Sequence, residues 1–251
     1  SDAAAIQTRA ERRGGEWVIN GHKMWITNGY YADYYLLAAR TGPREARHRA
    51  ITVFLLPRSN CIEASPIEVM GVRGTGTAEL KLNGCVASDD DIVGEVNGGW
   101  KIIMHTLDVG RVAISGVALG VARGAFEEAL NWARNREVFG KKLTEMQNAQ
   151  FELAEMLAAI ETARTLAYYA AYLYDTKSPD FLLMSHVAKL QAARLAVDVT
   201  RRAVQMEGGF GYSKDSKAEM FYRDAKILEI GEGTNEIMKY VIYKLLEKSL
   251  G

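Results

Sequence analysis

The segment Gly231-Glu232-Gly233-Thr234 interrupts a helical pattern near the end of the chain. A carboxylate between two glycines suits a general base, because glycine lets the backbone approach a ligand closely and a glutamate in a pocket can remove a proton. The alternative is an exposed loop glutamate between two flexible residues. The surface bias of glutamate favours this alternative on these residues alone.

Three further segments combine residue types that suit a planar, phosphorylated ligand. Trp25-Ile26-Thr27 ends a predicted strand and offers an indole for stacking and a hydroxyl for one hydrogen bond, although an aromatic strand end before a turn explains it equally. Arg136, between two predicted helices, could grip a pyrophosphate with its forked guanidinium or complement a helix dipole. Gly208-Gly209 permits close approach of a ligand, and it equally ends a helix.

Two other patterns have structural explanations. Asp108 and Arg111 are three residues apart on one helix face, which predicts an ion pair within the helix. Thr144-Glu145-Met146-Gln147 fits a capping box, which gives Gln147 a role without any ligand.

Several catalytic signatures are missing from the sequence. The histidines are scattered and lack metal-ligand spacing with the cysteines, and there is no P-loop, no G-x-G-x-x-G after a strand and no Ser-His-Asp signature. No metal site is therefore predicted, and demanding chemistry would come from a carboxylate, a cofactor or both.

The composition is that of a globular protein. Of 251 residues, 48% are hydrophobic and 25% are charged, which excludes a disordered chain. The 31 basic and 31 acidic residues give a formal net charge of zero, which argues against nucleic-acid binding driven by bulk charge. Cys61 and Cys85 are too few for a disulfide framework, so a reducing compartment is the default expectation. The apolar stretch 112–130 is interrupted by charged residues, so no membrane span is expected.

Strands and turns are expected before about residue 100, where most prolines occur. Asn20-Gly21 suits a type I′ turn, so residues 17–19 and 23–26 are predicted to form a hairpin. Because no helix separates the strands, an antiparallel β sandwich or barrel is predicted. The further strands are expected at residues 34–40, 50–56, 62–68 and 78–82.

Helical periodicity extends over the remainder of the chain. Ser178-Pro179 is a good helix start, with serine as the N-cap and proline at the first helical position. Short loops between long helices favour an up-down four-helix bundle. The predicted organisation is a multi-domain α and β protein, with an antiparallel β barrel or sandwich domain at residues 1–97 and the helical bundle at residues 98–251. Helices are expected at residues 100–136, 144–175, 178–207, 218–230 and 235–248.

The order of these motifs resembles that of the acyl-CoA dehydrogenase family over almost the whole chain. The family has an N-terminal helical domain, a middle β domain and a C-terminal four-helix bundle, and this chain resembles the last two. It begins at the serine of the family's Thr-Glu-Pro-x-Ala-Gly-Ser-Asp segment, so the N-terminal domain is expected to be missing. The motifs that carry the resemblance are Ser1-Asp2 followed by Thr8, Asn20-Gly21-x-Lys23-x-Trp25-Ile26-Thr27-Asn28-Gly29, Leu107-Asp108-x-Gly110-Arg111, Arg136-x-x-Phe139-Gly140, Gln205-x-x-Gly208-Gly209-x-Gly211, Arg223-Asp224-Ala225-Lys226-Ile227 and Glu232-Gly233-Thr234.

The resemblance implies a role for each matching residue. Glu232 matches the base that removes the α-proton of an acyl-CoA thioester, after which the β-hydrogen leaves as hydride to flavin and trans-2-enoyl-CoA is formed. The cofactor contacts at the pyrophosphate and adenine end usually reach across a subunit interface. The positions that match FAD contacts are Trp25, Ile26, Thr27, Arg136, Phe139, Met146, Gln147, Gln205, Gly208, Gly209, Thr234, Asn235 and Glu236. The positions that match acyl-CoA contacts are Ser1, Asp108, Arg111 and Gly233.

One position narrows the subtype. In the isovaleryl and long-chain branches the base occupies the position of Gly110, which cannot serve, so this sequence resembles the short- and medium-chain type. The resemblance also implies FAD, an electron-transferring flavoprotein as acceptor, a homotetramer, fatty acid β-oxidation, and a bacterial cytoplasmic or mitochondrial matrix location. Two alternatives stay open: an inactive fragment that only oligomerises or binds, and an acyl-CoA oxidase that uses oxygen.

Overall fold

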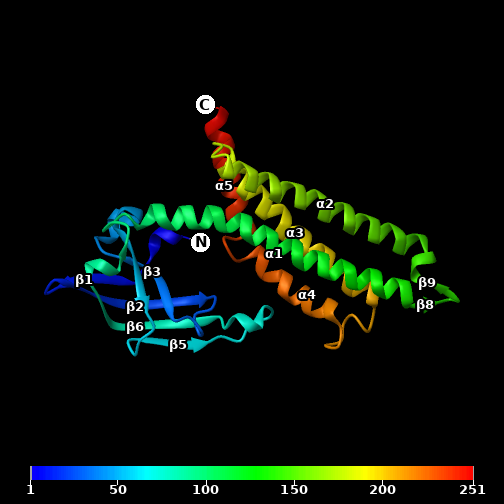
Figure 1. The fold of residues 1–251 in the computed structure, drawn as a ribbon, viewed down its shortest axis with the longest axis horizontal. Coiled ribbons are helices and arrows are strands. Elements are labelled where there is room, and N and C mark those ends of the chain that lie inside the picture. Colours follow the sequence, from blue (N-terminus) through cyan, green and yellow to red (C-terminus); the bar gives the residue numbers. More distant parts are fainter. Residues whose placement is uncertain (1, 251) are drawn as a thin grey trace. The chain divides into compact units, whose positions relative to one another are not determined.

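The computed structural model describes residues 2–250, which divide into two compact units with the boundary in the chain between Thr106 and Leu107. The first unit is built on a sheet and the second on long helices (Figure 1). This succession of a sheet unit and a helical unit confirms the predicted fold class. Helix α1, Gly99–Asn135, crosses the division, so a domain boundary between residues 97 and 98 remains our proposal.

The sheet of the first unit has seven strands in the order β5-β6-β2-β1-β3-β4-β7. Neighbouring strands are antiparallel except β1 and β3, which meet in parallel at a single pair, Arg9 and Arg40. Strands β1 and β7 were not predicted from the sequence. The strands are β1 Arg9–Arg13, β2 Glu16–Ile26, β3 Tyr34–Arg40, β4 Ile51–Pro57, β5 Ile62–Pro66, β6 Ala78–Ala87 and β7 Ile92–Val93.

The hairpin predicted at Asn20-Gly21 is wrong, because β2 continues through these residues, with a shift in its pairing to β6 between Ile19 and Gly21. A glycine is needed there for another reason: a Cβ on Gly21 would lie 2.6 Å from the Cα of Thr8. The tight turn is instead Gly14-Gly15, which joins β1 to β2 with positive φ at both residues. The Asn-Gly signal therefore marked a close backbone contact inside a strand.

The sheet core forms around Trp17 and Phe54, whose rings meet edge to face with centroids 5.9 Å apart. The indole of Trp17 also donates a hydrogen bond to Asp89, at 2.8 Å. Cys61 and Cys85 form a disulfide between the start of β5 and β6, which corrects the default expectation of reduced thiols. The pairing follows from strand register, because Ile62 lies opposite Leu82 and so brings the two cysteines together.

The second unit consists mainly of long helices (Figure 1), and the core between them is rich in alanine. Small side chains let helix backbones approach closely, and in α1 they recur on one face. The core alanines of α1 are Ala118, Ala122, Ala125, Ala129 and Ala133. The other helices are α2 Gln147–Asp175, α3 Phe181–Glu207, α4 Lys217–Ala225 and α5 Asn235–Leu250, with a 3-10 turn, Lys226–Glu229, after α4.

Both predicted helix starts differ in detail. Helix α3 begins later than expected, with Asp180 at its N-cap, and the Ser178 hydroxyl accepts only a long hydrogen bond from the Asp180 amide. Helix α2 has Met146 at its N-cap and no side-chain cap, so the capping box predicted at Thr144 and Gln147 is wrong. A short 3-10 turn, Leu143–Glu145, replaces the expected first turn of that helix.

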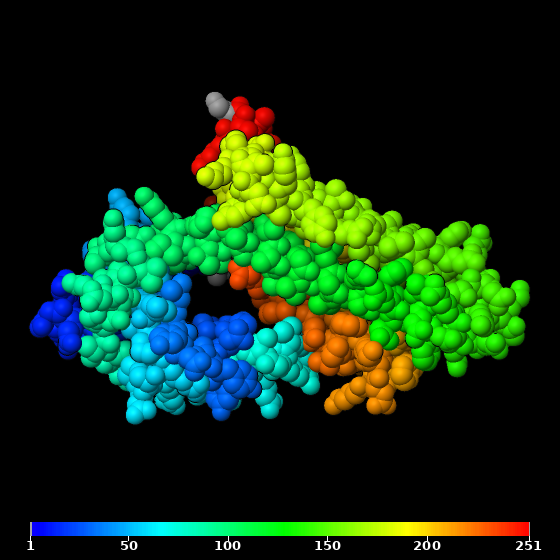
Figure 2. All heavy atoms as spheres, in the orientation of Figure 1, coloured from blue at the N-terminus to red at the C-terminus, as the bar shows by residue number. Residues whose placement is uncertain are grey.

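One helix in the described chain, α1, is long and apolar enough to cross a membrane, which corrects the expectation that no segment qualifies. A single such helix is weak evidence, because the core helices of soluble proteins pass the same test. The alanine face of α1 belongs to the core, while much of the rest of the helix lies on the surface (Figure 2).

Candidate functional site

The kink that carries Glu232 lies between the 3-10 turn Lys226–Glu229 and α5. Glu232 has a left-handed backbone with φ of +53°, which is uncommon for a residue other than glycine, and Gly233 follows with φ of +94°. Thr234 caps α5: its carbonyl accepts from the Met238 amide at 3.0 Å. The break in the helical pattern is thus a turn with a defined backbone conformation.

The side chain of Glu232 lies against the backbone of α1. A Cβ on Gly110 would stand 2.8 Å from the Glu232 Oε2 atom, so the carboxylate occupies the space that a larger residue would fill. Glu232 itself is exposed, as the alternative interpretation expected. The structure therefore brings the predicted base beside the helix position that the resemblance singled out.

Arg111 and Asp108 form the predicted ion pair within α1, with the Arg111 Nη1 atom 2.6 Å from an Asp108 carboxylate oxygen. Arg111 is buried, and its Nη2 atom lies 3.8 Å from where a Cβ would stand on Gly233. Burial lowers the pKa of Arg111, while the charges of Asp108 and Glu232 oppose this shift. Its buried Nε atom has no hydrogen-bond partner among the described residues. The predicted substrate contacts Asp108, Arg111 and Gly233 are thus grouped around Glu232.

Helix α3 adds two buried side chains that the sequence analysis missed, His186 and Lys189, each 1% exposed. The Arg111 Nη1 atom donates to the His186 Nε2 atom at 2.9 Å, and His186 Nδ1 donates to the Leu182 carbonyl at 2.6 Å. Burial lowers the pKa of His186 to about 4, so the ring is neutral. The sequence signal that could have found them is that His186 and Lys189 are polar residues three apart on a helix face that is otherwise apolar.

Lys189 reaches the kink itself. Its Nζ atom donates to the Gly233 carbonyl at 2.6 Å, and burial lowers the pKa of Lys189 to about 8. The amide of Asn235 donates to Glu229 at 3.0 Å across the same kink, and the Asn235 Oδ1 atom is buried without a partner among the described residues. Thr234, Asn235 and exposed Glu236, all predicted cofactor contacts, follow Glu232 directly.

A second group of predicted cofactor residues surrounds the other end of the helical unit. Arg136 precedes a small hairpin of β8, Glu137–Val138, and β9, Lys141–Lys142, and Phe139 at its turn is 99% exposed. Trp132 stacks on Phe210 with ring centroids 4.8 Å apart, which ties the end of α1 to the segment after α3. The predicted residues at this end are Arg136, Phe139, Met146, Gln147, Gln205, Gly208 and Gly209.

The two groups are not brought together within this unit. Lys189 and Gln205 lie on the same helix, α3, so at 1.5 Å of rise per residue they are about 24 Å apart along its axis. Both residues belong to one continuous helix, Phe181–Glu207.

The third group of predicted cofactor residues lies at the end of β2 in the sheet unit. Trp25 has a positive φ of +61° at an irregularity in the pairing of β2 with β6, and its indole is 65% exposed. Ile26 and Thr27 line a hollow of about 510 Å³, which Lys23 also lines. An exposed indole beside a hydroxyl fits one face of a planar ring, so these residues suit the isoalloxazine of FAD.

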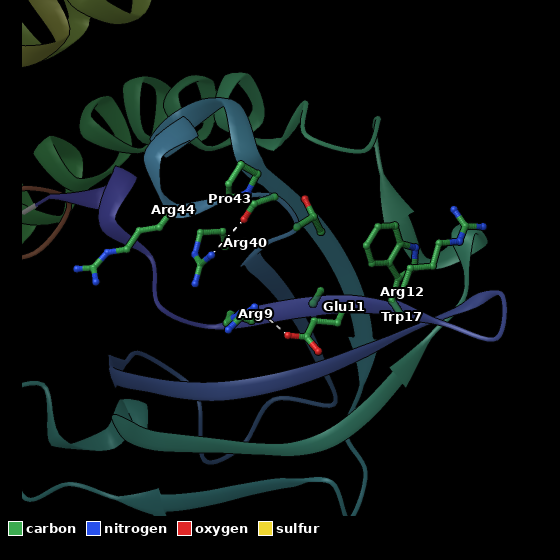
Figure 3. Close-up of a pocket in the computed structure, with 10 residues that line it drawn as sticks. Arg9, Glu11, Arg12, Trp17, Arg40, Pro43 and Arg44 are labelled. Atoms are coloured by element: carbon green, nitrogen blue, oxygen red, sulfur yellow. Dashed lines mark hydrogen bonds and ion pairs between the residues drawn. The ribbon is translucent and has the colours of Figure 1, made fainter.

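A different hollow in the sheet unit, of about 760 Å³, is lined by four arginines, of which Arg40 faces β1 from the end of β3 (Figure 3). None of the predicted site residues lines it. Ser1, a predicted acyl-CoA contact, lies outside the described residues. Within residues 2–250, no group of three or more histidine, cysteine, aspartate or glutamate side chains is placed to hold a metal ion.

The comparisons with known proteins agree with the motif order. Residues 97–246 match the family model of the acyl-CoA dehydrogenase C-terminal domain, and residues 1–85 match that of the acyl-CoA dehydrogenase middle domain. The chain belongs to the acyl-CoA dehydrogenase family.

Individual relatives are similar over nearly the whole chain. The human mitochondrial short-chain specific acyl-CoA dehydrogenase is 43% identical over 244 residues, which cover 96% of this chain and 59% of that relative. The structure of butyryl-CoA dehydrogenase from Megasphaera elsdenii matches with a TM-score of 0.94 at 36% identity, covering 98% of this chain and 64% of the other. A structure from a study of the electron transferring flavoprotein of Acidaminococcus fermentans matches with a TM-score of 0.94 at 38% identity and the same coverage. The chain thus spans about 60% of the length of its relatives.

The neutral state of His186 predicts a pH-dependent stability. Its pKa is about 4 in the folded protein and 6.5 in a model compound, so between these values the unfolded chain binds a proton that the folded chain does not. The free energy of unfolding should therefore fall as the pH drops from 6.5 to 4, by up to roughly 3 kcal/mol from this group.

Imidazole NMR signals measure this directly. We expect the signal that disappears in His186→Gln to show no titration above about pH 4.5, and the variant to lose part of the acid destabilisation. A His186 midpoint near 6.5 would contradict the neutral, hydrogen-bonded assignment.

Proposed function

We propose that this chain carries the base and the cofactor contacts of an FAD-dependent acyl-CoA dehydrogenase, which converts an acyl-CoA thioester to trans-2-enoyl-CoA. The observation that carries the proposal is the Glu232 carboxylate beside Gly110, with Arg111 and Asp108 adjacent. The names of the human and Megasphaera elsdenii relatives favour a short acyl chain, such as butyryl.

Proton removal next to a thioester needs more than a carboxylate. The α-proton is weakly acidic, so the site must stabilise the negative charge that develops on the thioester oxygen. The backbone N–H of Glu232 donates to no other group among the described residues, so it is available to that oxygen. In our proposal the Glu232 side chain takes the α-proton while its own N–H binds the thioester oxygen.

The predicted cofactor residues would bind different parts of FAD. FAD, when bound, accepts the β-hydrogen as hydride. Trp25 and Thr27 would contact its isoalloxazine. Thr234 and Asn235, which follow Glu232 in the chain, would also contact the cofactor. Arg136 and Gln205 would hold the pyrophosphate and adenine end, where the family resemblance implies contacts that usually reach across a subunit interface. A homotetramer is the assembly that we propose on this basis.

The electron acceptor that we propose is an electron-transferring flavoprotein. The structural match to the Acidaminococcus fermentans study supports this partner. Fatty acid β-oxidation in a mitochondrial matrix or a bacterial cytoplasm fits the same activity, and the human relative is mitochondrial.

A visible absorption spectrum, recorded before and after anaerobic addition of butyryl-CoA, tests the proposal. We expect a flavin spectrum that bleaches in the wild-type chain, and a flavin spectrum that does not bleach in Glu232→Gln, because the amide cannot take the proton. Bleaching of Glu232→Gln at the wild-type rate would contradict the assignment of the base. A protein that stays colourless with excess FAD would favour the inactive, oligomerising fragment, and oxygen consumption without an added acceptor would favour the oxidase.

Gly110→Ala provides a second prediction, with Gly116→Ala on the same helix as its matched control. A Cβ at position 110 meets only the flexible end of Glu232, whereas a Cβ at 116 meets nothing within 4 Å. Both variants should fold, with stability raised by up to about 1 kcal/mol through better helix propensity. We expect the bleaching rate of Gly110→Ala to fall by about 10- to 100-fold through displacement of the base. Equal rates in the two variants would show that the carboxylate does not need this space.

A further inference from the structure

We propose that Lys189 and His186 of α3 are positioning residues for the base: Lys189 fixes the turn that carries Glu232, and His186 fixes Arg111 beside it. This inference rests on the proposed function of Glu232. Neither residue occurs among the predicted site residues, and neither touches the Glu232 carboxylate in any hydrogen bond of the described structure. Their effect is therefore exerted through Gly233 and Arg111.

Lys189 holds the backbone immediately after the base. The hydrogen bond from its Nζ atom to the Gly233 carbonyl is 2.6 Å long and joins α3 to a turn 44 residues further along the chain. Glu232 and Gly233 both have positive φ, a conformation that persists for a residue such as glutamate only where surrounding contacts determine it. Lys189 is the contact from α3 that fixes the carbonyl of this turn.

The surroundings of Lys189 are electrostatically suited to this role. The carboxylates of Glu229, Glu232 and Glu236 stabilise its ammonium, whereas Arg111 and burial oppose it. Burying a charge is unfavourable unless it is paired and hydrogen-bonded, so a methionine of similar shape would be expected in a helix that needed only packing here. The lysine is therefore better explained by its hydrogen bond to the turn than by the stability of the core.

His186 acts on the other side of the site. Arg111 Nη1 has two hydrogens, and it directs one to Asp108 and the other to His186, at 2.6 and 2.9 Å. The opposite ring nitrogen of His186 donates to Leu182, which leaves Nε2 as an acceptor. This pair of acceptors fixes the guanidinium plane, so that Nη2 lies next to Gly233.

The test uses the whole chain with FAD and compares loss variants with conservative ones. Lys189→Met removes the donor and keeps the shape, and Lys189→Arg keeps the charge. His186→Leu removes the acceptor for Arg111, and His186→Gln supplies an amide oxygen in its place. Arg194→Met is the matched control, because Arg194 is an exposed cation on the same helix.

Three readouts separate positioning from structure: the unfolding midpoint, amide hydrogen exchange of residues 231–236, and kcat and KM for butyryl-CoA. For Lys189→Met we expect an unfolding midpoint at or above that of the wild type. Exchange at residues 231–236 should be at least about 10-fold faster, and kcat about 100-fold lower with KM within about 3-fold, as for a base displaced by about an ångström. Lys189→Arg and His186→Gln should recover part of kcat, and Arg194→Met should match the wild type.

Separate outcomes would overturn the role of Lys189 and that of His186. Folded Lys189→Met with wild-type exchange and wild-type kcat would overturn the role of Lys189, and equal kcat in His186→Leu and His186→Gln would overturn that of His186. If Lys189→Met does not fold, the two His186 variants still decide whether α3 positions the site. If the wild type shows no turnover, the proposed function fails. In that case faster exchange at residues 231–236 in Lys189→Met still supports the hydrogen bond to the turn, and unchanged exchange rejects that hydrogen bond.

Discussion

The left-handed turn at Glu232 and Gly233 is the constraint on which the site depends. A glutamate at φ of +53° is held there by contacts from outside its own segment, namely the backbone of α1 at Gly110 and the Lys189 hydrogen bond from α3. The same turn leaves the Glu232 N–H without an acceptor among the described residues. One backbone conformation therefore presents a carboxylate and a hydrogen-bond donor at the same place, which is the combination that enolate formation needs.

Helix α3 carries the residues of two proposed roles in different parts of its length. In our proposal its N-terminal half supports the base through the hydrogen bonds of His186 and Lys189, and Gln205 and the glycines that follow lie at its C-terminal end. This continuous helix places Lys189 and Gln205 about 24 Å apart along its axis. The oligomer that we propose rests on the family resemblance, which implies that cofactor contacts at this end usually reach across a subunit interface.

Hydrophobic periodicity predicted the succession of a sheet unit and a helical unit, because both periods are local properties of the sequence. Predictions of turns and helix caps from local residues were less reliable. Asn20-Gly21 lies inside β2, since a close contact with Thr8 requires glycine there, and Ser178 and Thr144 cap no α-helix. Motif order placed Glu232, Asp108 and Arg111 in one site. It could not find His186 or Lys189, whose roles depend on contacts between helices, and it did not foresee the Cys61–Cys85 disulfide, which depends on strand register.

The central claim is that Glu232 removes the α-proton, and exchange of that proton with solvent tests it most directly. The measurement is deuterium incorporation, followed by mass spectrometry in D₂O, into 3-thiabutyryl-CoA, whose sulfur in place of the β-carbon blocks hydride loss. The account predicts incorporation with the wild-type chain loaded with FAD and loss of incorporation in Glu232→Gln. Incorporation by Glu232→Gln at the wild-type rate would contradict the account and assign the base to another residue.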